Sequence, residues 1–465
     1  MKNVLKKFIG DKAFYRMVMM VAIPIMIQNG VTNFVSLLDN IMVGQIGTLQ
    51  MSGVAIVNQL LFVYNMCVFG GLSGAGIFGA QFYGQRNEEG IRYTFRFKLW
   101  VGAITTLIGF VLLICFDDPL IMLYLHDGAE AGEAMLALPY AKEYLHIMLV
   151  GLIPFLAVQI YASTLRETGE TFLPMKAGIV AVFVNLIFNY LLIFGHFGFP
   201  EMGVKGAAIA TVLSRFVEAG IVIIWTHKHK AVHGYIRGAY RSLYIPKELV
   251  RNITVKGMPL LVNEAFWASG MAILLQCYSV RGLEVVAGMN ITSTITNLFN
   301  IVFIALGQAV AIIVGRLLGA GKMEEAKETD TKLIAFSVTC CVFVGTVLYI
   351  LAPLFPDMYN TEPIVKEYAT QFIRIAACFM PQTAFLQATY FTMRSGGRTI
   401  ITSLFDSGFI WILSIPLAFV LSRYTALAPA MVYFLCQAID IVKTICGFIL
   451  LKKGVWVQNI VEKKL

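Results

Sequence analysis

The feature that most constrains this chain is a series of long segments without a single charged side chain. Positions 17–38, 177–200, 285–315 and 333–356 contain no Asp, Glu, Lys or Arg. A helix that crosses a bilayer needs roughly 17–25 apolar residues, whereas the strands of outer-membrane barrels give alternating segments of about 10 residues. The sequence therefore predicts an all-α protein that crosses the membrane several times.

Composition agrees with this interpretation and excludes several classes. The chain has 465 residues, of which 58% are hydrophobic and 14% are charged, against about 45–50% and about 25% in soluble domains. Disorder, a secreted disulfide scaffold and a water-soluble enzyme are therefore not expected. The eight cysteines lie mostly in apolar runs and form no C-x-x-C pair, so we interpret them as small core residues. The first apolar run is too long for a cleavable signal peptide, and we expect it to remain in the mature protein.

Apolar runs bounded by charges or by glycine and proline define twelve candidate helices. Positions 40–85 carry no charge, so we place the break between the first two helices at 44–48, where glycine and polar residues make a turn. The approximate limits are 16–45, 52–83, 93–116, 140–165, 172–195, 205–227, 253–280, 286–315, 330–352, 364–393, 399–422 and 427–451.

The basic residues predict the orientation. If both termini are cytoplasmic, the inner segments hold 28 Lys and Arg and the outer loops hold five. Cytoplasmic loops are enriched in Lys and Arg, so we expect a multi-pass protein of the cell (inner or plasma) membrane with both termini inside. The net charge of +9 is then an orientation signal, and membrane lipid rather than nucleic acid is the expected partner.

The two halves of the sequence resemble each other. At an offset of 235, 22–24 matches 257–259, 53–56 matches 288–291 and 81–84 matches 316–319; at an offset of 228, 165–171 matches 393–399. Each half has an even number of spans, which predicts a parallel repeat about a pseudo-twofold axis along the membrane normal. Duplicated bundles of this kind are typical of secondary transporters.

This repeat predicts the domain organisation. We expect a six-helix N-terminal lobe over 1–228, a cytoplasmic connector over 229–252, and a six-helix C-terminal lobe with a short cytoplasmic tail over 253–465. The connector is basic, and we expect it to touch anionic lipid headgroups.

Charged side chains inside the spans are the candidate functional residues, because each costs roughly 2.5–3.5 kcal/mol at the bilayer centre. Asp39 lies late in the first span and Glu264 lies in the first span of the second half. We interpret both as carboxylates that bind a proton or a cation; the alternatives are an interfacial Asp39 and a structural Glu264.

Other polar residues in the spans are weaker candidates. Asn185 and Asn189 lie four residues apart, hence on one helix face, and either join helices or complete a cation or proton network. Asp406 stands without a nearby basic residue, so we expect it to line a cavity. We expect Asp440 to pair with Lys443, three residues later on the same helix.

Enzyme signatures are not found. The segment 315–323 resembles a phosphate-binding loop, but its spacing is one residue too long and Met323 stands where Ser or Thr should be. There is no H-E-x-x-H or G-x-S-x-G motif. We therefore expect a protein that is not an enzyme, that needs no cofactor and that uses an ion gradient as its energy source.

Several short segments, in order along the twelve spans, resemble the multidrug and toxic compound extrusion (MATE) family of cation-coupled antiporters. The resemblance covers essentially the whole chain. The segments are 22–24 leading to 39–44, 80–84, 165–169, 185–189, 203–211, 257–264 and 393–396.

The resemblance implies two six-helix lobes that open alternately to either side and export organic, often cationic, compounds in exchange for Na⁺ or H⁺. It places Asp39 at the carboxylate of the N-terminal lobe, with Asn185, Asn189 and Thr211 as polar neighbours. It places Glu264 at the cation-site carboxylate that some members have in the C-terminal lobe. A bound Na⁺ would then lie at Glu264 or Asp39.

Two departures from the family pattern leave the coupling ion open. Some members have an Asp where Thr383 stands here, and others have an Asp where Asn189 stands. Thr383 and Trp267 remain weaker candidates for lining the cavity, together with Asp406. The alternative function is a related flippase for a lipid-linked or polysaccharide precursor, although such a protein would be expected to line its cavity with several buried Arg or Lys, and only Arg215, Arg374 and Lys443 lie inside spans here. We expect a monomer that binds a small organic substrate.

Overall fold

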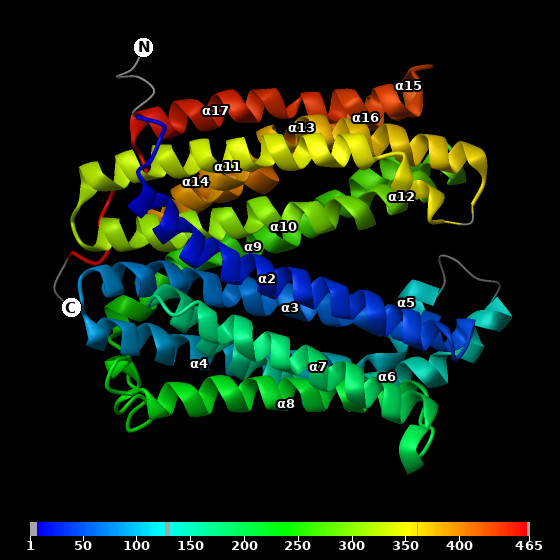
Figure 1. The fold of residues 1–465 in the computed structure, drawn as a ribbon, viewed down its shortest axis with the longest axis horizontal. Coiled ribbons are helices and arrows are strands. Elements are labelled where there is room, and N and C mark those ends of the chain that lie inside the picture. The colour runs from blue at the N-terminus through cyan, green and yellow to red at the C-terminus, as the bar shows by residue number, and fades with distance from the viewer. Residues whose placement is uncertain (1–6, 126–130, 360, 463–465) are drawn as a thin grey trace. The chain divides into compact units, whose positions relative to one another are not determined.

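The computed structural model describes residues 7–125, 131–359 and 361–462, and in this part of the chain the regular elements are all helices (Figure 1). Helices are expected because the sequence predicts that most of the chain lies inside a lipid bilayer. Inside a bilayer the backbone must satisfy its own hydrogen bonds, and a helix does so within one segment. The all-α fold class is confirmed.

In the described residues of the first half there are seven α-helices and two short 3₁₀-helices. The helix α7 ends at Gly195, whose φ of 70° is the left-handed conformation that glycine adopts at helix ends. The elements are α2 (Lys12–Gly44), α3 (Thr48–Gly84), α4 (Glu88–Cys115), α5 (Asp117–Leu125), α6 (Ala131–Glu167), α7 (Phe172–Phe194), η1 (His196–Gly198), α8 (Val204–Lys228) and η2 (Gly234–Ile236).

The second half repeats this order. Its fifth span contains two π-helical segments between α14 and α15, and its sixth span is broken at Ile439. The elements are α9 (Lys247–Ser279), α10 (Leu283–Gly319), α11 (Met323–Leu351), α12 (Leu354–Asp357), α13 (Pro363–Ser395), α14 (Thr399–Ser403), η3 (Leu404–Gly408), η4 (Ile410–Ser414), α15 (Ile415–Tyr424), α16 (Pro429–Ala438) and α17 (Asp440–Lys453).

The helix bounds follow the internal repeat. Both ends of α2 and α3 lie 235 residues before the corresponding ends of α9 and α10, and α6 ends 228 residues before α13. These are the two offsets found in the sequence. The chain therefore consists of two six-helix lobes related by an internal repeat, as predicted.

Eleven helices in the described residues are long and apolar enough to cross a membrane. The predicted tenth span corresponds to α13, a helix of 33 residues that carries Lys366, Glu367 and Arg374 and is therefore more polar than the others. Its last two turns are almost entirely buried, so α13 is a central helix of its lobe.

The chain forms two compact units, which we describe separately. The N-terminal unit comprises Ile27–Gly79 and Glu88–Arg251, and the C-terminal unit comprises Met1–Met26, Ala80–Asn87 and Asn252–Leu465. The first turns of α2 and the end of α3 thus belong to the C-terminal unit. The domain limits given above, which follow the spans in sequence order, stay a prediction.

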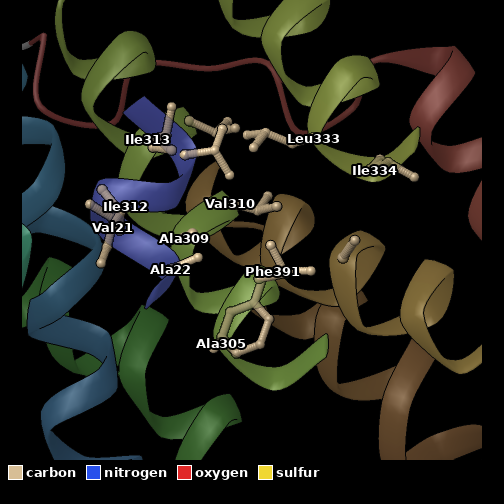
Figure 2. Packing of buried hydrophobic residues seen from close by; sticks show 14 of the residues in the cluster. Val21, Ala22, Ala305, Ala309, Val310, Ile312, Ile313, Leu333, Ile334 and Phe391 are labelled. Atoms are coloured by element: carbon tan, nitrogen blue, oxygen red, sulfur yellow. The ribbon is translucent and has the colours of Figure 1, made fainter. Parts of the chain in front are cut away.

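An apolar cluster forms the core of the C-terminal unit (Figure 2). Val21 and Ala22 of α2 pack there with residues of α10, α11 and α13, including Ala305, Leu333 and Phe391. The backbones come very close where α3 and α10 end: a Cβ atom on Gly84 would collide with the carbonyl oxygen of Arg316, and one on Gly319 with that of Gln81. Glycine is required at both places.

The connector between the lobes is an ordered part of the N-terminal unit. Arg96 of α4 donates hydrogen bonds to the carbonyl oxygens of Gly238 and Ala239, both at 2.9 Å, and Tyr235 is buried. Burial also lowers the pKa of the His233 imidazole from its usual 6.5. The connector is therefore fixed to α4, and its contact with lipid headgroups stays a prediction.

The segment after α17 has the corresponding place in the C-terminal unit. Trp456 is buried, and the fully buried Gln81 donates to the carbonyl oxygen of Ser395 (2.9 Å) and accepts from the backbone N–H of Ile460 (2.9 Å). In each repeat, the segment that follows the sixth span therefore packs on its own unit.

Candidate functional site

The predicted polar residues of the N-terminal unit form one hydrogen-bonded chain. The amide nitrogen of Asn189 donates to the Asp39 carboxylate and also to Asn185 Oδ1, at 3.1 Å in the second case. Asn185 Nδ2 donates to Thr211 Oγ1 at 3.2 Å, and Thr211 donates to the carbonyl oxygen of Ala207 at 3.0 Å. Helices α2, α7 and α8 thus bring Asp39, Asn185, Asn189 and Thr211 together.

One hydrogen-bond acceptor in this network lacks a partner among the described residues. Asn189 is fully buried, and its Oδ1 atom has no hydrogen-bond partner among the described residues. A buried oxygen without a partner is costly, and here it belongs to the residue that contacts Asp39. A carboxylate with a nearby amide oxygen is the donor set that a hard cation or a proton-carrying water prefers.

Arg215 of α8 and Tyr144 of α6 border this cluster, and both interact electrostatically with Asp39. The Arg215 guanidinium lies over the Phe155 ring, 4.7 Å from its centroid. Arg215 also attracts Glu218, one turn further along α8. The positive charge of Arg215 is therefore shared between two carboxylates.

In the C-terminal unit, Glu264 is half-buried on α9, and the structure gives its carboxylate no hydrogen bond among the described residues. It interacts electrostatically with Arg394 and with Asp406. The structure thus places Glu264 within range of a second acid and a cation, and its role in binding a cation stays a prediction.

One expectation about Asp406 is wrong. Asp406 has a basic partner, because Lys443 of α17 lies 3.3 Å from its Oδ1 atom. Lys443 also interacts electrostatically with Asp440, three residues before it, while its ion pair across helices is with Asp406. The buried Asn263 donates to the other Asp406 oxygen at 3.1 Å and accepts from Ser407 Oγ at 2.6 Å. These four residues connect α9, the first π-helical segment and α17.

The weaker candidates are not drawn into either cluster. Thr383 donates to the carbonyl oxygen of Phe379 on its own helix, at 3.1 Å, and Trp267 is half-buried on α9. The described residues contain no group of three or more His, Cys, Asp or Glu arranged to hold a metal ion. A Na⁺ ion at Asp39 or Glu264 would need amide, hydroxyl or carbonyl oxygens as further ligands.

A buried ion pair in the N-terminal unit was not expected from the sequence. Lys98 is one of the 28 Lys and Arg assigned above to the inner segments, but its side chain is fully buried on α4. Its Nζ atom lies within hydrogen-bond distance of both Glu167 oxygens (2.7 and 2.8 Å), Ser163 Oγ (3.1 Å) and Thr164 Oγ1 (3.0 Å), and its three hydrogens are shared among these acceptors. The carboxylate rests against α3 where Gly76 and Gly79 leave room for it. These two glycines are the sequence signal for this pair.

A second buried acid was also missed. Asp330 of α11 is 3% exposed, and Thr392 Oγ1 of α13 lies 2.5 Å from its Oδ1 atom. Asp330 follows three Glu and precedes Lys332, so the sequence alone suggested a solvated helix start.

Comparison with known proteins agrees with this architecture. The MatE family model matches residues 24–191 and 259–420, which is most of the chain and includes a part of each lobe. The chain therefore belongs to the MatE family, a family of membrane transport proteins.

Curated relatives cover almost the whole length. The chain is 27% identical over 406 residues to a probable multidrug resistance protein NorM of Thermotoga maritima, covering 87% of this chain and 84% of the relative. It is 24% identical over 415 residues to the multidrug resistance protein MdtK of Pectobacterium atrosepticum, covering 88% of each.

Solved structures share the fold. A multidrug resistance MATE family transporter described in its outward-facing conformation superposes with a TM-score of 0.85 at 20% identity, covering 98% of both chains. A transporter of the MOP superfamily from Pyrococcus furiosus, described as having a binding pocket of reversed polarity, superposes with a TM-score of 0.83 at 19% identity, covering 96% of this chain and 97% of that one. At this identity the likeness concerns the fold alone.

Proposed function

We propose that this protein is a secondary active antiporter that exports organic, often cationic, compounds from the cell in exchange for Na⁺ or H⁺, by alternating access between its two lobes. The observation that carries the proposal is the hydrogen-bonded cluster of the buried Asn185 and Asn189 with the half-buried Asp39 and Thr211, in which Asn189 Oδ1 has no partner among the described residues. The names of the relatives support the substrate class.

The physical role of Asp39 follows from its surroundings. Burial disfavours a bare carboxylate, so Asp39 gains most from binding a proton or a cation when water is excluded. A gradient can drive a transport cycle only if the ion binds the two access states with unequal affinity. A carboxylate held by an amide network that opens and closes around it meets this requirement, and Glu264 is a second candidate for the same role.

The flippase alternative is less well supported. An exporter of a polyanionic headgroup needs buried cations that are free to bind it. Lys98 is bound to Glu167 and Lys443 to Asp406, so neither charge is available without breaking an ion pair.

The test is dye export by purified protein in vesicles, with a Na⁺ gradient and a pH gradient imposed separately. We expect Asp39→Asn to fold, because the amide keeps the size and hydrogen bonds of the carboxyl group, and to lose gradient-driven export. Asp118→Asn is the matched control: Asp118 is an exposed acid of the same unit, paired with Lys142 at 2.7 Å, and its replacement should leave export unchanged. Export by Asp39→Asn at the wild-type rate under both gradients would contradict the coupling role.

A further inference from the structure

Asp330 is a buried acid that lies outside both clusters described above. It belongs to α11 of the C-terminal unit and its side chain is 3% exposed. Neither the proposed ion coupling nor the proposed substrate binding uses it, so its burial needs a separate explanation.

Apolar core residues flank Asp330 along α11 and Thr392 along α13. Leu333 and Ile334 of α11 belong to the apolar cluster of this unit (Figure 2), as do Ala388 and Met393 of α13. An ionised carboxylate in such surroundings is very costly unless a cation or several hydrogen bonds compensate its charge.

No cation pairs with Asp330 in the described part of the chain. On α11, Lys327 pairs with Glu324 and Lys332 with Glu328. On the neighbouring helices, Arg316 of α10 lies over the Tyr83 ring and Arg394 of α13 over the Phe391 ring. Two other helices, α2 and α17, also contribute to the apolar cluster of this unit. Their cations closest to this end of the unit, Arg16, Lys452 and Lys453, are exposed.

The hydrogen bonds of Thr392 indicate the protonation state of Asp330. Thr392 Oγ1 lies 2.5 Å from Asp330 Oδ1 and 3.0 Å from the carbonyl oxygen of Ala388. A hydroxyl group has one hydrogen to donate. If Asp330 were ionised, Thr392 would give its one hydrogen to the carboxylate, that single hydrogen bond would have to compensate a full buried charge, and the carbonyl oxygen of Ala388 would keep only the backbone N–H of its own helix. If Asp330 is protonated, its O–H donates to Thr392 and Thr392 donates to Ala388, so both bonds are made.

The internal repeat supports a hydrogen bond in which Asp330 is the donor and Thr392 the acceptor. The offset of 228 places Thr392 at the position of Thr164, where the same arrangement occurs with an unambiguous donor. Thr164 Oγ1 accepts from the Lys98 ammonium (3.0 Å), which is a donor only, and donates to the carbonyl oxygen of Ile160, four residues earlier (2.8 Å). Thr392 likewise faces the carbonyl four residues earlier, so with a protonated Asp330 it makes the same two bonds as Thr164, accepting on one side and donating on the other.

We infer that Asp330 is a proton-binding site of the C-terminal unit, separate from Asp39 and Glu264, and that it carries its proton in this conformation. Asp330 lies seven residues after the start of α11 at Met323, about 10 Å along the helix axis. The proton is therefore within two turns of the start of α11, where Lys322, Glu324 and Glu325 are exposed. Loss of the proton leaves a bare charge between α11 and α13 and weakens their packing.

The test is the infrared spectrum of the full-length protein in lipid nanodiscs, titrated from neutral to mildly alkaline pH. At neutral pH we expect a C=O band of a protonated carboxylic acid that is present in the wild type and missing in Asp330→Asn. Thr392→Val should shift the frequency of the same band, because the acid loses its acceptor, whereas Thr392→Ser should leave it in place. Asp357→Asn, at an exposed acid of the same unit, is the matched control and should change no such band.

A second arm measures thermal unfolding from mildly acidic to mildly alkaline pH. The wild type should lose stability as the pH rises toward the value at which folded Asp330 ionises, above which the dependence levels off, and Asp330→Asn should not show this loss. A wild-type spectrum that lacks any protonated-acid band attributable to Asp330 at neutral pH would overturn the inference. If Asp330→Asn does not fold, an unshifted band in Thr392→Val would overturn it equally.

Discussion

Lys98 with its partner Glu167, and Asp330 with its partner Thr392, occupy corresponding places in the two repeats. They differ in how the buried charge is neutralised. In the N-terminal unit, Lys98 is neutralised by Glu167. In the C-terminal unit, the position that corresponds to Glu167 is Ser395 and the position that corresponds to Lys98 is Leu333, at the offsets of 228 and 235. The acid there is Asp330, one turn before Leu333, and it has no counter-charge among the described residues.

This difference teaches how the repeats have diverged in function. A complete ion pair binds no further proton and holds α4 and α6 together over a wide range of pH. A single buried acid must exchange a proton instead, and it links the packing of α11 and α13 to pH. The corresponding threonines, Thr164 and Thr392, connect the buried group to the carbonyl oxygen four residues earlier in both units.

The largest expected effect comes from breaking the ion pair. Lys98→Met leaves Glu167 buried beside two glycines without its cation, and removing one partner of a buried pair costs about 3–5 kcal/mol. We expect a large fall in the thermal unfolding temperature in detergent. The double variant Lys98→Met/Glu167→Leu should regain most of the loss. Equal stability of Lys98→Met and the wild type would mean that the pair does not hold α4 to α6.

A smaller effect should separate the two threonines. Thr392→Val removes the acceptor of the Asp330 proton and leaves a buried donor unpaired, at a cost of about 1–3 kcal/mol. Thr164→Val should cost less, about 0.5–1.5 kcal/mol, because Lys98 keeps both Glu167 oxygens and Ser163. Thermal unfolding of both variants measures the difference. A greater loss in Thr164→Val than in Thr392→Val would contradict the contrast between the two units.

The smallest effect concerns the glycines that make room for Glu167. Gly79→Ala places a Cβ against the carboxylate and should destabilise the N-terminal unit by about 1 kcal/mol, although alanine favours the helix. Gly220→Ala on α8 is the matched control, because no atom lies within 4 Å of the added Cβ, and it should stabilise by up to about 1 kcal/mol. The same sign of change in both variants would show that Glu167 can move aside at no cost.

The C-terminal unit shows why those glycines are there. At the offset of 235, Ala311 and Val314 stand where the N-terminal unit has Gly76 and Gly79. No carboxylate corresponding to Glu167 has to be placed beside them, because Ser395 stands at its position. The glycines of α3 thus provide the space that the Glu167 carboxylate occupies. The larger residues at the corresponding positions of α10 agree with the lack of a corresponding ion pair among the described residues of the C-terminal unit.

By itself, the sequence determined the membrane class, the positions of the spans and the internal repeat, and it showed that Asp39 and Glu264 are carboxylates inside spans. These features are readable because they depend on one segment at a time: a span is a long apolar run, and a charge inside it is visible in the run. Asp39, Asn185 and Asn189 were predictable as a group only because the last two share one helix face and the family resemblance adds the first.

Only the tertiary structure decided which buried charges meet. Lys98 and Glu167 are 69 residues apart, Asp406 and Lys443 are 37 apart, and both pairs join different helices. The sequence placed Lys98 in a cytoplasmic segment and left Asp406 without a partner. The physical reason is that membrane helices are apolar on all sides, so the sequence pattern does not mark the face that turns toward a neighbour, and the rotation and packing of each helix select its partners.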